Sequence, residues 1–71
     1  MITTENLENW FTYHSPDGAD KFNFEKIREA ARYFAQVLVD NTPPSADQTA
    51  AIRKVREAVM TANASIVCRG K

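Results

Sequence analysis

The sequence of 71 residues has one cysteine, two glycines and one histidine, and its charges cancel. One cysteine cannot form an internal disulfide, which excludes a disulfide scaffold. A formal net charge of zero gives no general attraction to a DNA or RNA polymer or to an anionic membrane. Long apolar runs and a signal-peptide pattern are also lacking, so we expect neither membrane insertion nor export, but a reducing cytosol.

The composition that is present is typical of a folded protein. The chain is 44% hydrophobic, 25% charged and 10% aromatic, which excludes a disordered polar tail. Residues 1–71 fit a single domain and are too few for separate cofactor and substrate domains. Because so short a chain has a marginal core, we expect self-association to supply part of its stability.

Turn residues cluster at two places and divide the chain into three expected helices, over about 4–11, 20–41 and 45–69. Thr3 or Thr4 could cap the first helix. The sequence Ser15-Pro16-Asp17-Gly18 predicts a turn, and Thr42-Pro43-Pro44 ends the second helix. Ser45 and Gln48 have the spacing of a capping box at the start of the third helix, and Gly70 offers a stop at its end.

Both long helices carry an apolar stripe with three-four spacing. The stripes are Phe24, Ile27, Ala31, Phe34 and Leu38 in one helix, and Ile52, Val55, Val59, Ala62 and Ile66 in the other. A short connection makes such helices antiparallel, so the predicted fold is all-α: a short N-terminal helix followed by a helical hairpin. Further apolar residues flank the stripes, and we expect a homo-oligomer to cover them.

Catalytic motifs are scarce. The sequence has no Gly-rich phosphate loop, no cysteine pair for zinc and no Gly-x-Ser-x-Gly turn, so we expect no enzyme, no metal site and no cofactor. Without a nucleophile motif nearby, His14 is better explained by turn capping or ligand contact than by base catalysis. Cys68 fits a small, partly buried structural residue.

Aromatic residues gather in the segment Trp10-Phe11-Thr12-Tyr13-His14. We expect Trp10 and Phe11 to fasten the first helix onto the hairpin, and Tyr13 and His14 to lie at the surface. A ring presented from a loop beside a cation can stack on a nucleotide base while the cation meets its phosphate.

Cations lie on the second helix at Lys26, Arg28 and Arg32, interleaved with Glu25 and Glu29. The spacing permits exposed ion pairs from Glu25 to Arg28 and from Glu29 to Arg32, which would make this simply a solvated face. The basic run Arg53-Lys54-Val55-Arg56-Glu57 favours solubility first and an anion site second. Asn63 interrupts the apolar side of the last helix, either as a buried hydrogen-bonding residue or facing water.

Several of these motifs, in this order and spacing, resemble the phage anti-CBASS cyclic-nucleotide sponges, to which the Thoeris anti-defence sponges are related through the same hairpin. The resemblance extends from about Leu7 to Arg69. Its parts are Phe11-Thr12-Tyr13-His14-Ser15-Pro16, Ile27-Arg28, Ala31, Phe34-Ala35, Pro44-Ser45, Ala51-Ile52, Glu57-Ala58-Val59-Met60 and Ala62-Asn63-Ala64.

The resemblance implies a bacteriophage protein in the cytoplasm of the host bacterium that binds cyclic oligonucleotide messengers without cleaving them and so blocks immune effectors. It also implies a hexamer built as a trimer of dimers. Cyclic dinucleotides bind such sponges between two protomers, and some members hold cyclic trinucleotides in separate pockets about a three-fold axis.

By position, the resemblance implies that Tyr13 stacks on a base and that Arg28 meets a phosphate, with Lys26 and His14 as neighbouring ligand contacts. Arg69 corresponds to a cation of the trinucleotide pocket. Ala30 stands where the family can carry a hydroxyl, so one hydrogen bond to the ligand is absent here. The alternative function is an oligomeric helical module that docks a host or phage protein through its apolar strip and binds no nucleotide.

Overall fold

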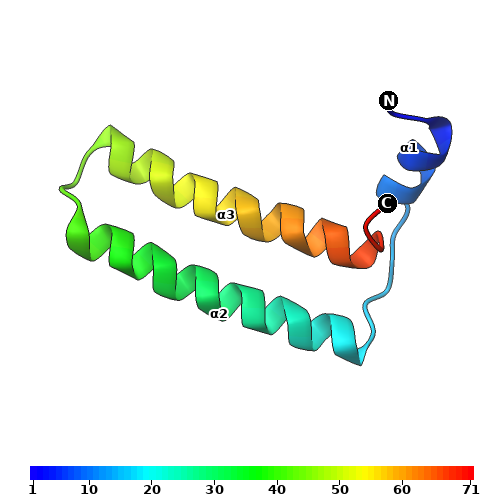
Figure 1. Cartoon of the computed structure of the whole chain (residues 1–71), viewed down its shortest axis with the longest axis horizontal. Helices are drawn as coiled ribbons and strands as arrows, with labels where there is room; N and C mark the ends of the chain where they lie inside the picture. Colours follow the sequence, from blue (N-terminus) through cyan, green and yellow to red (C-terminus); the bar gives the residue numbers. More distant parts are fainter.

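The computed structural model describes residues 1–71 and contains three α-helices and no strand (Figure 1). The helices are α1 (Thr4–Trp10), α2 (Gly18–Asn41) and α3 (Ala46–Val67). α2 and α3 run antiparallel and are joined by a short turn, while α1 lies beside the C-terminus at the opposite end of the hairpin (Figure 1). The predicted all-helical fold, with a short first helix and a helical hairpin, is confirmed.

The first two helices are capped at their N-termini by side chains. Of the two threonines, Thr3 caps α1, since its side chain accepts a hydrogen bond from the backbone N–H of Asn6. Asp17 caps α2 by accepting from the backbone N–H of Asp20 at 2.8 Å. Because Asp17 is the cap, α2 begins at Gly18, two residues before the expected start at 20. The predicted turn therefore also serves as the N-terminus of the helix.

The connection between α2 and α3 is a tight turn held by Ser45 and Gln48. Thr42, which precedes a proline, is extended and ends α2. Ser45 accepts a hydrogen bond from the backbone N–H of Gln48 at 3.1 Å. The Gln48 side chain donates to the carbonyl oxygen of Thr42 at 3.1 Å instead of returning to Ser45. The capping box is thus half formed, and the amide fastens the start of α3 to the end of α2.

Replacing Ser45 by Ala removes the cap of α3, and we expect the free energy of unfolding to fall by about 1 kcal/mol. For a domain of this size such a loss lowers the melting temperature by roughly 4 to 8 °C. Thermal melts followed by circular dichroism measure the change. Ser15→Ala, at an exposed serine in the loop before α2, is the matched control. Equal melting temperatures for the two variants would show that the cap contributes nothing.

The C-terminal end of α3 differs from the expected boundary at 69. The helix ends at Val67, because Arg69 and Gly70 adopt positive φ values of 56° and 75°. The N–H of Gly70 then donates to the carbonyl oxygen of Ser65 at 2.9 Å, which closes the last turn. Gly70 is the stop that the sequence indicated, but Arg69 also takes the left-handed conformation, which is unusual for a residue with a side chain.

The hairpin is a single layer and has almost no interior. Its extents are 44 × 30 × 15 Å, and only Asp20 and Cys68 are buried, at 3% and 8% exposure. Most residues of the two apolar stripes are half-buried along the line where α2 meets α3, whereas Phe34 stays 53% exposed. A chain that buries so little apolar surface by itself draws little stability from its own core.

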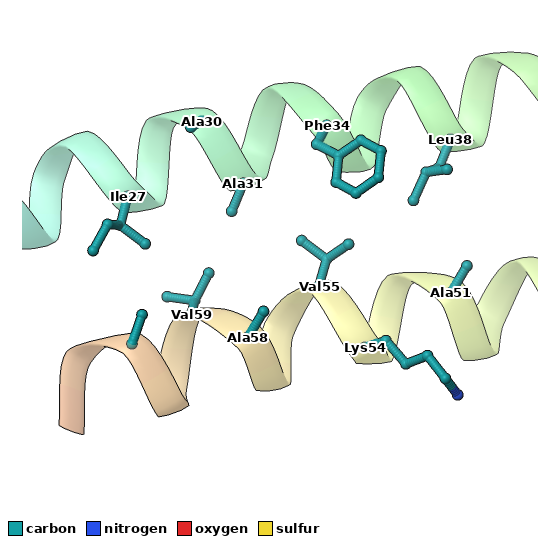
Figure 2. Close-up of a pocket in the computed structure, with 11 residues that line it drawn as sticks. Ile27, Ala30, Ala31, Phe34, Leu38, Ala51, Lys54, Val55, Ala58 and Val59 are labelled. Atoms are coloured by element: carbon teal, nitrogen blue, oxygen red, sulfur yellow. The ribbon is translucent and has the colours of Figure 1, made fainter. Parts of the chain in front are cut away.

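One face of the hairpin carries a long apolar groove of about 690 Å³ between α2 and α3. In Figure 2, Phe34 and Leu38 extend from α2 towards Val55 and Ala51 of α3, while the ammonium of Lys54 points away. We call this the apolar groove, and its lining is Ile27, Ala30, Ala31, Phe34, Leu38, Ala51, Lys54, Val55, Ala58, Val59 and Ala62. All but one of these residues are hydrophobic, which is typical of a surface that another protein surface covers.

Candidate functional site

A second groove of about 310 Å³ lies between α2 and α3 and contains Arg28, one of the cations expected to bind a ligand. Arg28 and Arg32 enter it from α2, one turn apart, and Arg56 enters it from α3. We call this the arginine groove. Its other lining residues are Ala31, Ala35, Ile52, Val55, Val59 and Met60. Three guanidinium groups thus share one hollow whose remaining walls are apolar.

These three arginines have no partner within the chain. Both ion pairs of the structure are made by Arg69, so the expected pairs from Glu25 to Arg28 and from Glu29 to Arg32 were wrong. An exposed intrahelical pair gains only a few tenths of a kcal/mol and fixes two long side chains. The guanidinium groups therefore keep all their N–H donors for an external anion.

Tyr13 lies in the loop between α1 and α2 and is 83% exposed, as expected of a surface ring. It is not among the residues that line the arginine groove, so one chain does not bring Tyr13 and Arg28 into that hollow.

The two aromatic residues before Tyr13 have different fates. Trp10 is 43% exposed, and its indole N–H donates to the carbonyl oxygen of Lys71 at 3.3 Å, so it links α1 to the C-terminus. Phe11 is 84% exposed and fastens nothing. The prediction that both rings attach α1 to the hairpin was therefore wrong for Phe11, which caps the C-terminal end of α1 with its ring exposed.

His14 is half-buried and tied to the preceding helix. Its Nε2 lies 2.6 Å from the carbonyl oxygen of Asn9. A carbonyl oxygen only accepts, so Nε2 carries the proton in this hydrogen bond. His14 thus secures the loop that presents Tyr13, and its Nδ1 is the ring atom left for a ligand. Cys68 is buried beside the same carbonyl, with its Sγ 3.9 Å from the Asn9 oxygen.

Lys26 lies on α2 and does not line the arginine groove. Its Nζ is 5.5 Å from the centre of the Phe22 ring, in the range of a cation–π contact. Phe22 itself is 61% exposed, so the pair forms a small surface feature near the start of α2. Lys26 and Arg28 diverge in the structure, as their two-residue spacing predicts.

Arg69 is held by a buried carboxylate. Its Nη1 and Nη2 donate to the two carboxylate oxygens of Asp20 at 2.7 and 3.0 Å, and Asp17 lies 3.6 Å from Nη2. This hydrogen bonding lowers the pKa of Asp20 and raises that of Arg69. Nη1 also donates to the carbonyl oxygen of Ile66 at 3.3 Å. The Arg69 side chain is still 59% exposed, so part of the guanidinium remains open to solvent.

Asn63 proves to be partly buried on α3. Its Oδ1 is enclosed and accepts no hydrogen bond within the chain. A buried acceptor without a donor is destabilising. The Oδ1 of Asn63 is the one buried side-chain nitrogen or oxygen atom in the structure that has no hydrogen-bond partner. Of the two alternatives for Asn63, burial is confirmed, while a hydrogen-bonding partner is missing within one chain.

In a comparison with known protein families, the chain matches the family described as "Acb2/Tad1, hairpin domain". The match covers residues 3–67, which is nearly the whole chain and includes all three helices. The chain belongs to the Acb2/Tad1 hairpin family. No curated protein and no solved structure matches it. The family is one of sponge-type binding proteins of phage anti-defence, and the resemblance seen in the sequence is thereby confirmed.

Two further observations on this Acb2/Tad1 hairpin concern metal ions and membranes. No group of three or more His, Cys, Asp or Glu side chains gathers where a metal ion could be held. None of its helices combines the length and the apolarity needed to cross a membrane. A further hollow of about 270 Å³ is lined by Glu29, Arg32, Tyr33 and Gln36, so Arg32 borders both this hollow and the arginine groove.

Sequence reasoning missed three residues that the Acb2/Tad1 hairpin brings into these features. Asp20 is three residues after Asp17, a spacing that indicates a cap but not a carboxylate that grips the other end of the chain. Arg32 and Arg56 were visible as cations on two helices, but the sequence does not show that they converge beside the line where the stripes meet. Their convergence depends on the rotation of α2 against α3.

The Asp20–Arg69 pair predicts a pH dependence of stability. The folded pKa of Asp20 is lower than its ordinary value of 3.8, so the folded state binds the carboxylate proton less readily than the unfolded state. The stabilising contribution is complete above pH 3.8 and is lost as the pH falls through the lower folded pKa. Asp20→Asn should abolish this part of the acid dependence.

Melting temperatures measured from about pH 6 to about pH 2 test this prediction. The difference between wild type and Asp20→Asn should be constant above pH 5 or so and shrink at the acid end. Asp47→Asn, at an exposed carboxylate in the first turn of α3, controls for the loss of one negative charge. A wild-type curve parallel to that of Asp20→Asn at every pH would contradict the role of the pair.

Proposed function

We propose that this protein is a phage anti-defence sponge, which binds cyclic oligonucleotide messengers in the host cytoplasm and withholds them, uncleaved, from bacterial immune effectors. The observation that carries the proposal is the unpartnered Arg28 guanidinium in an apolar-walled groove of a chain of the Acb2/Tad1 family. An arginine without an internal partner offers a planar, permanently charged donor set that suits a phosphate.

The binding site lies between two protomers in this proposal. The arginine groove of one chain meets the exposed Tyr13 ring of another chain, and a two-fold axis repeats the arrangement. A cyclic dinucleotide has two phosphates and two bases, so the same symmetry provides two cations and two rings. His14 follows Tyr13 directly and Lys26 is two residues before Arg28, and both are neighbouring contacts in this proposal. Ala30 has no hydroxyl to offer a ligand, and it lines the apolar groove and not the arginine groove.

The energies suit a messenger-binding protein. Charge-assisted hydrogen bonds contribute roughly 1.5 to 3 kcal/mol each, and base stacking contributes about 1 to 3 kcal/mol per base. Two of each give about 5 to 12 kcal/mol before the losses of ordering, whereas a micromolar complex needs about 8 kcal/mol. Submicromolar affinity is thus reachable for a protein of zero net charge.

The apolar groove supports the assembly in this proposal. A second copy of the chain covers the apolar groove, where Phe34 is 53% exposed in the isolated hairpin. One interface for the ligand and another for the apolar groove are two different contacts, as a trimer of dimers requires. The resulting hexamer presents several ligand sites from a minimal chain, which suits a protein that acts by lowering the free messenger concentration.

Arg69 is the cation of a separate cyclic trinucleotide pocket in this proposal. Asp20 engages one N–H of each terminal nitrogen, and the carbonyl oxygen of Ile66 accepts from Nη1 as well. The donors left for a ligand are the Nε–H and the second N–H of Nη2, which lies 3.6 Å from Asp17. Three copies about a three-fold axis would match the three phosphates of a cyclic trinucleotide. The buried carboxylate keeps the Arg69 side chain in place before the ligand arrives, which reduces the ordering that binding requires.

Recovery of intact ligand tests storage against cleavage. The purified protein is mixed with a panel of cyclic di- and trinucleotides, freed of unbound ligand and heated to release what it holds. Chromatography of the supernatant should return the cyclic compounds unchanged. Recovery of linear products would overturn the sponge function, and heat-denatured protein added to the same panel controls for spontaneous hydrolysis.

The apolar groove favours a second candidate, a protein-docking module without a nucleotide ligand. Such a module would leave the melting temperature unchanged by every cyclic nucleotide and would yield a stoichiometric protein partner from infected cells. A ligand-induced rise in melting temperature distinguishes the two, because a ligand that binds only the folded state stabilises it.

A further inference from the structure

Two cations of the arginine groove are left without a role by the family resemblance. Arg32 and Arg56 line the same hollow as Arg28, from α2 and α3. We propose that Arg28, Arg32 and Arg56 together form a clamp for the phosphates of a nucleotide ligand, with Arg32 and Arg56 as additional binding residues. The identity of that ligand as a cyclic dinucleotide rests on the proposed function, whereas the clamp rests on the groove itself.

The geometry of the clamp comes from the pairing of the helices. Side chains four residues apart on a helix are neighbours, about 5 to 6 Å between their Cβ atoms, so Arg28 and Arg32 flank one side of the hollow. Arg56 faces them from the antiparallel helix. None of the three forms an ion pair within the chain, and no acidic residue lines the groove. Three like charges held together in this way are stabilised by an anion between them.

The walls of the groove indicate the class of ligand. Between the arginines lie Ala31, Ala35, Ile52, Val55, Val59 and Met60, and none of these offers a polar side chain. A bare phosphate would leave this surface wet, whereas a nucleotide places its phosphates on the guanidinium groups and the face of a base or sugar on the apolar wall. The groove therefore suits an organic molecule that combines at least two negative charges with a flat apolar part.

The arginine groove is distinct from the apolar groove. They share only Ala31, Val55 and Val59, which lie where the helices meet, and the remaining lining residues belong to one groove or the other. Arg28, Arg32 and Arg56 thus lie on the side of this line away from Phe34 and Leu38. A second copy that covers the apolar groove does not have to close the arginine groove, so assembly and ligand binding are compatible.

Single substitutions test the clamp. We expect Arg32→Ala and Arg56→Ala to raise the Kd for 3′,3′-cyclic di-AMP or cyclic di-GMP about 10- to 100-fold for each copy of the arginine that the pocket loses, since each copy makes one charge-assisted contact. Arg53→Ala is the matched control: it removes the same charge from an exposed position of α3 that lines neither groove. Isothermal titration calorimetry measures Kd, and size-exclusion chromatography checks that every variant assembles as the wild type does.

A second probe, ADP, separates this proposal from the proposed function, because it carries a base and two linked phosphates without being a cyclic messenger. If cyclic dinucleotides bind but Arg32→Ala and Arg56→Ala behave like Arg53→Ala, the clamp is overturned and the sponge function stands. If only ADP binds and its Kd rises in Arg32→Ala and Arg56→Ala, the clamp stands and the sponge function fails. If wild type binds neither probe, both are overturned.

Discussion

Arg28→Ala is expected to bind cyclic dinucleotides about a hundred- to ten-thousand-fold more weakly than the wild type. A two-fold pocket contains two copies of the residue, and each lost charge-assisted hydrogen bond contributes roughly 1.5 to 3 kcal/mol, so the substitution removes about 3 to 6 kcal/mol. The fold should not change, since the Arg28 side chain makes no ion pair within the chain. Calorimetric titration with a panel of cyclic dinucleotides measures the loss.

Tyr13→Ala should weaken the same ligands through lost stacking, by about 1 to 3 kcal/mol for each base. Phe11→Ala is its control, because Phe11 is 84% exposed in the same segment and has no proposed contact with the ligand. The chromatographic mass of all three variants should equal that of the wild type. Wild-type affinity in both Arg28→Ala and Tyr13→Ala would show that the pocket lies elsewhere.

Phe34→Asp is expected to break the assembly. Phe34 lines the apolar groove and is 53% exposed in the single hairpin, so the monomer loses little when it is replaced. In the assembly each copy forfeits roughly 1.5 to 3 kcal/mol of apolar burial, and the buried carboxylate adds a desolvation penalty of several kcal/mol. Because the ligand site needs two protomers, binding of cyclic dinucleotides should disappear together with the assembly.

Light scattering coupled to size-exclusion chromatography measures the mass of Phe34→Asp directly. Phe22→Asp makes the same chemical change on α2 at a residue that is 61% exposed and outside the apolar groove, and it should retain the wild-type mass. Loss of the assembled species is expected whether or not the separated chains remain helical. An unchanged mass for Phe34→Asp would contradict the apolar groove as the contact between copies.

The fold was predictable because local signals agreed with one another. The stripes that include Ile27 and Val55 fixed the buried side of each long helix, and the proline pair after Thr42 permitted only a tight connection. The helix ends were less predictable. α3 ends at Val67 because Arg69 and Gly70 take positive φ values, and Arg69 then pairs with Asp20, a contact between residues far apart in the chain that no local pattern contains.

The candidate site was predictable in part, and for a different reason. Arg28 and Tyr13 were identified through the family resemblance, and the structure adds that one is unpaired and the other exposed. The basic run that contains Arg56 was interpreted first as a solubility feature and second as an anion site, because the chain has no strong net charge. Only the packing of α3 on α2 separates Arg56, which enters the arginine groove, from Arg53, which does not.

Native mass spectrometry of the wild-type protein mixed with a panel of cyclic di- and trinucleotides tests the central claim most directly. The account predicts an oligomer of identical chains whose mass increases by whole numbers of intact cyclic nucleotides, with the increase for cyclic dinucleotides absent in Arg28→Ala. A protein that stays monomeric at micromolar concentration, or an oligomer whose mass is unchanged by every cyclic nucleotide offered, would contradict it.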